Sequence, residues 1–285
     1  MSTNYILTLS CHDTRGIVAS VTGFLANHDG FIIESTQFGD PSTERFFMRV
    51  QFSSGAATPP HAALKAQFAA EVAGPFAMEW GMADAGVKTR VAILVSKQLH
   101  CLNDLLHRYR TGQLPMEIPA VISNHADARS IVEWHGIPFF HLPIEGGDKA
   151  AQEQNIRDIL TRERVDIVVL ARYMQILSPE LSATLRGRAI NIHHSFLPSF
   201  KGAKPYHQAH ERGVKLIGAT AHYVTDALDE GPIIDQEVTR VDHSYSPDAL
   251  ARMGQDIEAL VLTRSLTYQL EHRVLLNGTK TVVFR

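Results

Sequence analysis

An asparagine and a histidine two positions apart carry the most evident chemistry in this 285-residue sequence. Asn191 and His193 end an apolar run that predicts a buried strand, and residues two apart in a strand project to the same side. An amide N–H and a protonated imidazole can both stabilise an oxyanion, and the imidazole can also deliver a proton. The pair predicts a site that activates a carbonyl group. The alternative is a turn-capping asparagine beside an ordinary buried histidine.

A carboxylate-rich loop follows downstream of this pair. Residues 225–234 place Asp226, Asp229 and Glu230 close together before another predicted strand. A carboxylate in this loop could pair with His193 and orient an attacking water molecule. The residues alone do not choose among the three.

Two other kinds of site compete with this interpretation. His207 and His210 stand at i and i+3 of a short helix predicted over residues 204–213, so both imidazoles could chelate a divalent metal. No carboxylate–histidine pattern completes such a set of ligands. Ser195 and Ser199 lack the glycine-flanked turn that exposes a nucleophilic serine. We therefore expect neither a metal nor a cofactor, and keep a metal-dependent amidohydrolase as an alternative.

Several function classes lack their motifs here. The sequence contains no GxGxxG, GxxxxGK[ST], GxSxG or HExxH pattern. These absences count against a nicotinamide-dependent enzyme, a P-loop enzyme, an α/β-hydrolase and a zincin.

Charge, cysteine content and hydropathy exclude some partners and indicate the cellular compartment. The net charge of −3 provides no basic stripe for a phosphate backbone, so we expect no nucleic-acid partner. Cys11 and Cys101 share no ligand spacing, which favours free thiols in a reducing cytoplasm. No apolar run approaches the roughly 20 residues that span a bilayer, so we expect no membrane insertion.

The element that must position Asn191 and His193 belongs to an alternating pattern. Strand signals at 91–95, 118–122, 139–142, 167–170 and 189–192 alternate with helical signals at 101–110, 127–135, 149–163 and 179–185. Such alternation predicts right-handed crossovers and a Rossmann-like, mainly parallel sheet. Ligands of such sheets bind at the carboxyl ends of the strands, where the pair lies.

A separate unit precedes this sheet. Strands at 5–9, 31–38, 45–52 and 77–81 and helices at 17–25 and 61–72 give the order βαββαβ, which predicts a ferredoxin-like antiparallel sheet with helices on one face. The small and polar segment 84–88 predicts a linker. We therefore expect domains at residues 1–83 and 89–285.

Three stretches together carry a family resemblance. They are NIHHSFLPSFKGAKPYHQAHERGVKLIGATAHYVTDALDEGPIIDQE at 191–237, ISNHAD at 122–127 and LARYMQILS at 170–178. They resemble the folate-dependent formyltransferase superfamily, whose members hold an Asn-x-His pair and a downstream Asp-x-Gly. The resemblance covers most of residues 89–240.

The resemblance implies roles for particular residues. Asn191, His193 and Asp229 would be the catalytic trio, acting on 10-formyltetrahydrofolate. The implied substrate-binding residues are Tyr173, Met174, Gln175, Ile176, Leu177 and His194. Core packing is the alternative for the apolar members, and an exposed loop position is the alternative for His194.

Two features of the sequence, the loop after the first strand of the parallel sheet and the N-terminal unit, favour the hydrolytic branch of the superfamily. Members that formylate glycinamide ribonucleotide hold its phosphate on a Gly-Ser-Asn loop, but residues 96–101 read SKQLHC, without glycine. The N-terminal unit, with the turn DTRGI at 13–17, resembles the ACT domain of the hydrolytic branch. This implies hydrolysis to formate and tetrahydrofolate, with the formate feeding purine and one-carbon metabolism. Transfer to a small amine acceptor remains an alternative.

The ACT resemblance also implies partners. It predicts a homo-oligomer, and either an amino-acid effector at residues 1–83 or a purely dimerising role for them. A catalytically inactive ACT sensor is the non-enzymatic alternative, although the complete set of Asn191, His193 and Asp229 argues against it.

Overall fold

The computed structural model describes residues 2–144, 146–197 and 205–285, which divide into two compact units. The first unit comprises Met1–Lys88 and Glu271–Arg285, and the second comprises Thr89–Leu270. The boundary after Lys88 falls at the end of the expected linker. The chain end differs from our expectation, because residues 271–285 belong with the first unit and not with the second.

Polar contacts attach the chain end to the first unit. Residues 274–283 form a hairpin of β12 (Val274–Asn277) and β13 (Lys280–Val283). Asn277 donates to the Asp40 carboxylate at 2.7 Å, and Lys280 Nζ lies 3.2 Å from the same oxygen. Arg49 Nε donates to the Glu271 carbonyl at 3.0 Å. These contacts join residues far apart in sequence, so strand and helix periodicity could not reveal them.

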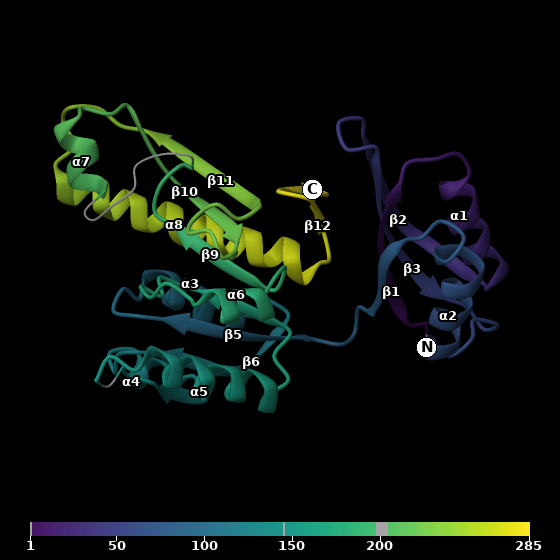
Figure 1. The fold of residues 1–285 in the computed structure, drawn as a ribbon, viewed down its shortest axis with the longest axis horizontal. Coiled ribbons are helices and arrows are strands. Elements are labelled where there is room, and N and C mark those ends of the chain that lie inside the picture. Colours follow the sequence, from purple (N-terminus) through teal and green to yellow (C-terminus); the bar gives the residue numbers. More distant parts are fainter. Residues whose placement is uncertain (1, 145, 198–204) are drawn as a thin grey trace. The chain divides into compact units, whose positions relative to one another are not determined.

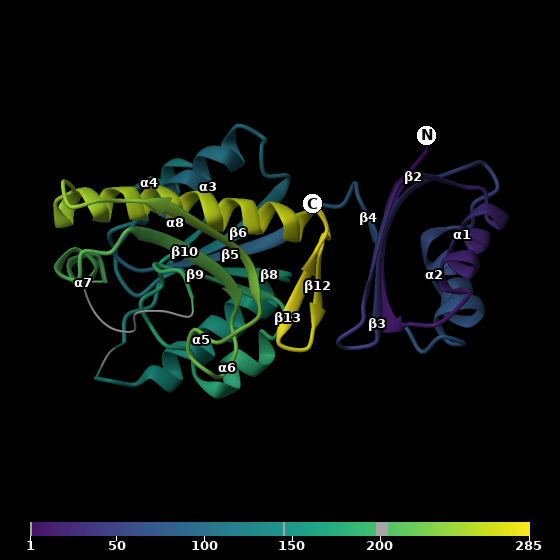
Figure 2. The ribbon, with the colours of Figure 1, turned by 90° about the horizontal axis from the view of Figure 1, so that it is seen from above.

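The first unit has the expected βαββαβ order. Its elements are β1 (Asn4–His12), α1 (Ile17–Asn27), β2 (Gly30–Asp40), β3 (Arg45–Ser54), α2 (His61–Phe68), a π-helical turn (Ala69–Ala73) and β4 (Glu79–Asp84). The strands form an antiparallel sheet in the order β2-β3-β1-β4. Both helices cover one face of this sheet (Figure 2).

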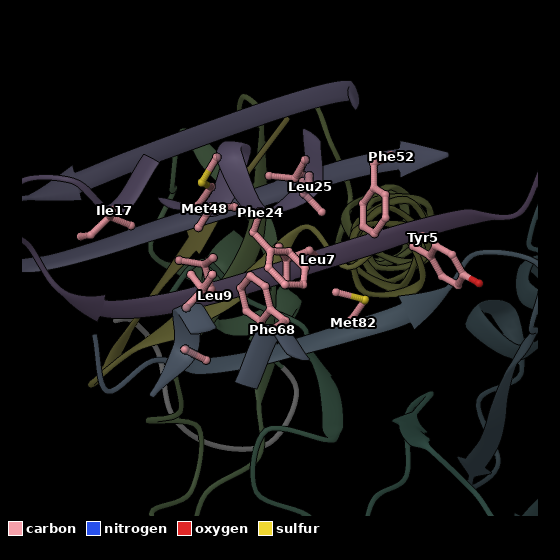
Figure 3. Close-up of a cluster of buried hydrophobic side chains, with 14 of the residues drawn as sticks. Tyr5, Leu7, Leu9, Ile17, Phe24, Leu25, Met48, Phe52, Phe68 and Met82 are labelled. Carbon is pink, nitrogen blue, oxygen red and sulfur yellow. The ribbon is translucent and has the colours of Figure 1, made fainter. Parts of the chain in front are cut away.

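That face holds a hydrophobic core (Figure 3). Leu7 and Leu9 of β1 are buried there because alternate residues of a strand face the same side. Phe24 of α1 and Phe68 of α2 meet edge to face at 5.2 Å between ring centroids. Met82 of β4 completes the contact between the strands and the helices. The unit therefore has a core of its own.

The second unit is built on a seven-stranded, mainly parallel sheet, as expected. Its elements are β5 (Thr89–Val95), α3 (His100–Arg110), β6 (Met116–Ser123), α4 (Arg129–Trp134), β7 (Phe139–His141), α5 (Lys149–Arg162), β8 (Ile167–Leu170), α6 (Pro179–Thr184), β9 (Ala189–His193), α7 (Pro205–Glu211), β10 (Leu216–Tyr223), β11 (Ile233–Arg240) and α8 (Pro247–Leu270). The strand order is β11-β10-β9-β8-β5-β6-β7. Strands β5 to β9 run parallel, and β10 runs antiparallel to both of its neighbours, β9 and β11.

Helices cover both faces of this sheet. Helices α5 and α6 pack on one face, and α3 and α8 lie on the other (Figure 2). The long helix α8, which the sequence analysis did not predict, runs beside β9, β10 and β11 (Figure 1). None of the described helices is long and apolar enough to cross a membrane.

The topology places the carboxyl ends of β8 and β9 next to each other. The two strands are parallel neighbours, with Leu170 beside Asn191. The strand order reverses at β5, which pairs with β6 on one side and β8 on the other. Crevices at such reversal points, outside the carboxyl ends of the strands, are where open α/β sheets bind ligands.

Candidate active site

A cavity of about 300 Å³ opens beside the carboxyl ends of β8 and β9. Its lining includes all the residues that the sequence analysis assigned to a site, namely Asn191, His193, Asp229, Tyr173, Met174, Gln175, Ile176, Leu177 and His194. The structure therefore brings together three chain segments that are distant in sequence. Asp226, the second candidate carboxylate, lines the cavity too, as do Arg172 and His222, which were not predicted.

His193 is fixed by the carboxylate of Asp229. Its Nδ1 lies 3.2 Å from Asp229 Oδ2, and a carboxylate oxygen only accepts, so Nδ1 carries the proton of this contact. The His193 side chain is buried, with 8% of its residue surface exposed. Its other nitrogen, Nε2, is buried and has no hydrogen-bond partner among the described residues. The imidazole is therefore oriented by one nitrogen and leaves the other for a ligand.

Asp229 reaches the site from the loop between β10 and β11. Its backbone is left-handed, with φ of 56°, which is uncommon for a residue other than glycine. Two positions on, Gly231 lies so close to β10 that a Cβ atom there would stand 1.7 Å from the Tyr223 carbonyl oxygen. Gly231 thus lets the loop press against the strand, which brings the Asp229 carboxylate to His193.

The environment keeps Asp229 ionised. Burial opposes ionisation, but the hydrogen bond from His193 Nδ1–H outweighs it and holds the pKa of the carboxyl well below its usual range. Asp226 also lines the cavity, yet Asp229 is the loop carboxylate that contacts both imidazoles. The structure thus favours Asp229 among the three loop carboxylates.

His222 on β10 orients the amide of Asn191. The antiparallel register sets the two residues opposite each other, and Asn191 Nδ2 lies 3.2 Å from His222 Nε2. His222 Nδ1 donates to the Tyr223 carbonyl at 2.9 Å, so Nε2 of the neutral ring accepts from the amide. Asn191 therefore keeps a second N–H for the cavity. The only sequence signal for His222 was an imidazole within an apolar strand.

The segment from Tyr173 to Leu177 forms an apolar wall of the cavity. Met174 and Ile176 are 58% and 61% exposed, so they are not core residues, and the core alternative is wrong for them. Leu177 both lines the cavity and packs against the core. Tyr173 is buried, and burial together with the nearby Glu153 raises the pKa of its hydroxyl to about 12. A flat, partly apolar ligand could lie against this wall.

Polar contacts from two other elements hold this wall in place. Ser96, directly after β5, accepts from the Met174 backbone N–H at 3.0 Å. On α5, the buried Glu153 carboxylate accepts from the Ser178 backbone N–H at 2.8 Å, and Lys149 donates to the Ile176 carbonyl. Because the backbone is tied at both ends, the wall is preorganised for a ligand.

The loop after β9 is anchored by a buried hydroxyl. Thr220 on β10 donates to the Ser195 carbonyl at 2.9 Å and accepts from the Leu197 N–H at 3.1 Å. Leu197 is buried and closes this loop onto the core, whereas Phe196 is half exposed. Ser199, which the sequence analysis considered as a nucleophile, and residue 204, the first of the expected helix, lie outside the described residues.

The metal alternative gains no support from α7. His207 and His210 are exposed on this helix, and neither belongs to a group of three potential metal ligands within the described ranges. One such group, His100, Cys101 and Glu258, does occur. There, Glu258 already binds His100, Tyr206 and Arg172, and burial raises the pKa of the Cys101 thiol. This group is therefore better described as a buried hydrogen-bonded cluster.

Comparisons with known proteins place this chain in a family. The model of the family described as formyl transferase matches residues 89–266. A formyltetrahydrofolate deformylase from Corynebacterium sp. (strain P-1) is 51% identical over 281 residues, covering 99% of this chain and 98% of the relative. One from Bacillus subtilis is 48% identical, covering 98% and 93%. The crystal structure of a formyltetrahydrofolate deformylase from Burkholderia mallei has a TM-score of 0.95 at 50% identity, covering 99% of this chain and all of that chain.

Proposed function

Because this chain belongs to the formyltetrahydrofolate deformylases, within the formyl transferase family, we infer that it hydrolyses 10-formyltetrahydrofolate to formate and tetrahydrofolate. We further propose that Asn191, His193 and Asp229 carry out this reaction without a bound metal or a covalent intermediate. The observation that carries the assignment is the convergence of these three side chains on one cavity.

The first step is addition of water to the formyl carbon. The Asp229 carboxylate, which stays ionised at neutral pH, orients the water and takes one of its protons as the new C–O bond forms. The carbonyl π electrons move onto the formyl oxygen. Asn191 Nδ2–H and protonated His193 Nε2–H then stabilise this oxyanion, because both donors are already in place before the charge develops.

The second step breaks the bond to N10. The oxyanion re-forms a carbonyl, the C–N10 bond cleaves, and N10 takes the proton from His193 Nε2. The products are tetrahydrofolate and formic acid, and the acid ionises to formate. Asp229 then releases its proton to solvent, and His193 Nε2 takes one up from solvent, which restores the imidazolium. Atoms and charges balance with water as the only co-substrate.

The folate occupies the apolar wall in this proposal. Met174, Ile176 and Leu177 provide exposed apolar surface beside the catalytic groups, and Leu228 faces them from the opposite loop. Gln175 offers an amide at the same wall. A flat heterocycle packed between two apolar surfaces with a few polar contacts is the usual arrangement in small-molecule sites.

The test is to measure formate from 10-formyltetrahydrofolate with and without glycinamide ribonucleotide. We expect formate release that does not depend on the amine. Acceptor-dependent turnover without free formate would instead identify a transferase. Asn191→Ala and His193→Ala should each abolish most formate release, and near-normal rates in both would refute the site assignment.

For the first unit we propose an ACT domain that pairs chains into a homo-oligomer. The support is its βαββαβ order with the strand arrangement β2-β3-β1-β4. An amino-acid effector is the alternative ligand of this unit, and equilibrium dialysis with glycine and with methionine would detect it. Two buried free thiols, Cys11 and Cys101, fit a reducing compartment such as the cytoplasm.

A further inference from the structure

A buried cluster of charged side chains lies behind the candidate site. Its centre is Glu258 of α8, which is 1% exposed. His100 Nε2 and Tyr206 Oη each donate to this carboxylate at 2.8 Å, and Arg172 Nε lies 3.4 Å from it. Burial opposes ionisation of Glu258, but the contacts with His100, Arg172 and Tyr206 outweigh it and lower the pKa. The cluster therefore holds an ionised carboxylate in the interior.

The shape of α8 allows this cluster to form. Gly254 lies one turn before Glu258, and a Cβ atom at this position would stand 1.9 Å from the Tyr206 hydroxyl oxygen. A side chain larger than hydrogen would push the tyrosine ring off the helix. The glycine thus gives the Tyr206 hydroxyl its path to the carboxylate.

Arg172 connects this cluster to His194. The guanidinium is buried, and its Nε donates to Gln98 Oε1 at 2.8 Å. Its Nη1 lies 2.9 Å from His194 Nδ1. A guanidinium can only donate, so His194 Nδ1 must accept, and the ring proton must reside on Nε2. The ion pair with Glu258 thus fixes one tautomer of His194.

The surroundings also keep His194 neutral. Burial, the Arg172 guanidinium and His193 lower its pKa, and these effects outweigh the opposing influence of Glu258 and Asp229, so that the pKa falls to about 4. At neutral pH the ring is therefore an uncharged N–H donor.

That donor has no acceptor in the described part of the chain. Nε2 of His194 is buried and unpartnered, as is Nε2 of the adjacent His193. The two rings stack with centroids 4.7 Å apart and planes 23° from parallel. A buried donor without a partner is costly, and two in neighbouring rings indicate that a ligand supplies the acceptor.

We propose that His194 is a further catalytic residue, a neutral donor to the formyl oxygen, and that the Arg172–Glu258 pair makes it one. The proposal rests on the proposed function, because the acceptor is the substrate's own oxygen. A neutral second imidazole adds a hydrogen bond to the developing oxyanion without placing a second positive charge beside His193. Arg172 and Glu258 act through His194 and are positioning residues.

Kinetics of two matched variants test the donor. His194→Phe keeps a flat ring to stack on His193 but removes the N–H, whereas His194→Gln keeps an N–H donor. Loss of one oxyanion donor lowers kcat by roughly 10²- to 10³-fold, so we expect that effect in His194→Phe with little change in KM. We expect the kcat of His194→Gln to be at least about ten-fold higher than that of His194→Phe. A His194→Phe enzyme within about three-fold of wild-type kcat would overturn the proposal.

The tautomer is tested on the wild-type enzyme by NMR of ¹⁵N-labelled histidine, with the His194 signals identified from their loss in the variants. We expect the spectra to show a proton on Nε2 and none on Nδ1. The signals should not change between pH 5 and 8, because this whole range lies at least about one unit above the pKa of about 4. In Arg172→Met the pKa of the ring should rise from this value, and the ring should lose its single tautomer, because the donor that holds Nδ1 as an acceptor is gone. The exposed Arg129→Met serves as the control and should leave the signals unchanged.

The outcomes separate the two proposals. Wild-type His194 titrating near 6.5 or protonated on Nδ1 would refute the inference and leave the hydrolysis intact. The NMR result decides this even if His194→Phe fails to fold. Absence of formate release by the wild-type enzyme, or its persistence in His193→Ala, would instead refute the proposed function.

Discussion

Replacing Asp229 by asparagine removes the charge on which the proposed mechanism depends while keeping the shape of the side chain. The carboxylate contacts His193 Nδ1 at 3.2 Å and lies 3.6 Å from His222 Nε2. An asparagine can still accept from His193 with its oxygen. Its NH2 group would then face His222 Nε2 and compete with the amide of Asn191 for the same lone pair. The substitution thus disturbs both halves of the oxyanion site.

The expected loss of kcat in Asp229→Asn follows from the two functions of the carboxylate. A hydrogen bond to a charged group contributes about 1.5–3 kcal/mol, and a neutral one about half as much, so weakening the His193 contact costs roughly ten-fold in rate. Loss of a group that takes up the proton of water costs a further 10²-fold or more. We therefore expect kcat to fall by roughly 10³- to 10⁴-fold, equivalent to about 4–5.5 kcal/mol of barrier. KM should change little, because the folate wall is untouched.

Formate release measured with a coupled formate dehydrogenase assay gives kcat and KM directly. Glu230→Gln is the matched control, since it removes one negative charge from the adjacent, exposed position of the same loop. We expect it to stay within a few-fold of the wild-type rate. The reasoning fails if Asp229→Asn retains more than a tenth of wild-type kcat, or if both variants lose activity equally.

Four further outcomes follow from the structure. Gly231→Ala should displace the loop that carries Asp229, because its Cβ would stand 1.7 Å from a β10 carbonyl oxygen, and we expect at least a ten-fold lower kcat; unchanged kinetics would show that the loop can shift freely. Thr220→Val should lower the free energy of unfolding in urea by about 1–3 kcal/mol, since it leaves buried partners unsatisfied, whereas an unchanged midpoint would contradict the anchoring role. Phe68→Ala should destabilise the first unit by about 3–5 kcal/mol, measured by the loss of hydrogen-exchange protection in β1 and β4; retained protection would argue against a core there. The pKa of Asp229 is lower in the folded state than the unfolded value of about 3.9, so the ionised carboxylate stabilises the fold above that pH and this contribution is lost as pH falls below it. The difference in stability between wild type and Asp229→Asn should therefore narrow below about pH 4, and a difference that stays the same there would contradict the lowered pKa.

The sequence by itself determined the architecture of each unit and the position of the central pair at the end of a strand. Alternating strand and helix signals predicted a mainly parallel sheet, and the structure confirms one built from β5 to β9. The prediction succeeds because the two-residue period of a strand and the 3.6-residue period of a helix both arise from local backbone geometry. Asn191 and His193 could be placed at a strand end for the same reason, and their partner carboxylate could be narrowed to one short loop.

Only the tertiary structure could choose Asp229 over its neighbours on geometric grounds, and only it revealed His222 and the cluster around Glu258. His222 meets Asn191 through the register of two antiparallel strands, and Arg172, just after β8, meets Glu258 of α8, a helix far along the chain. The chain end likewise joins the first unit through Asn277 and Asp40. The spacing of residue types along the chain does not reveal these contacts, because long-range packing sets strand register. Packing also decides which residues pair with a buried charge, since an unpaired charge is too costly to keep in the interior.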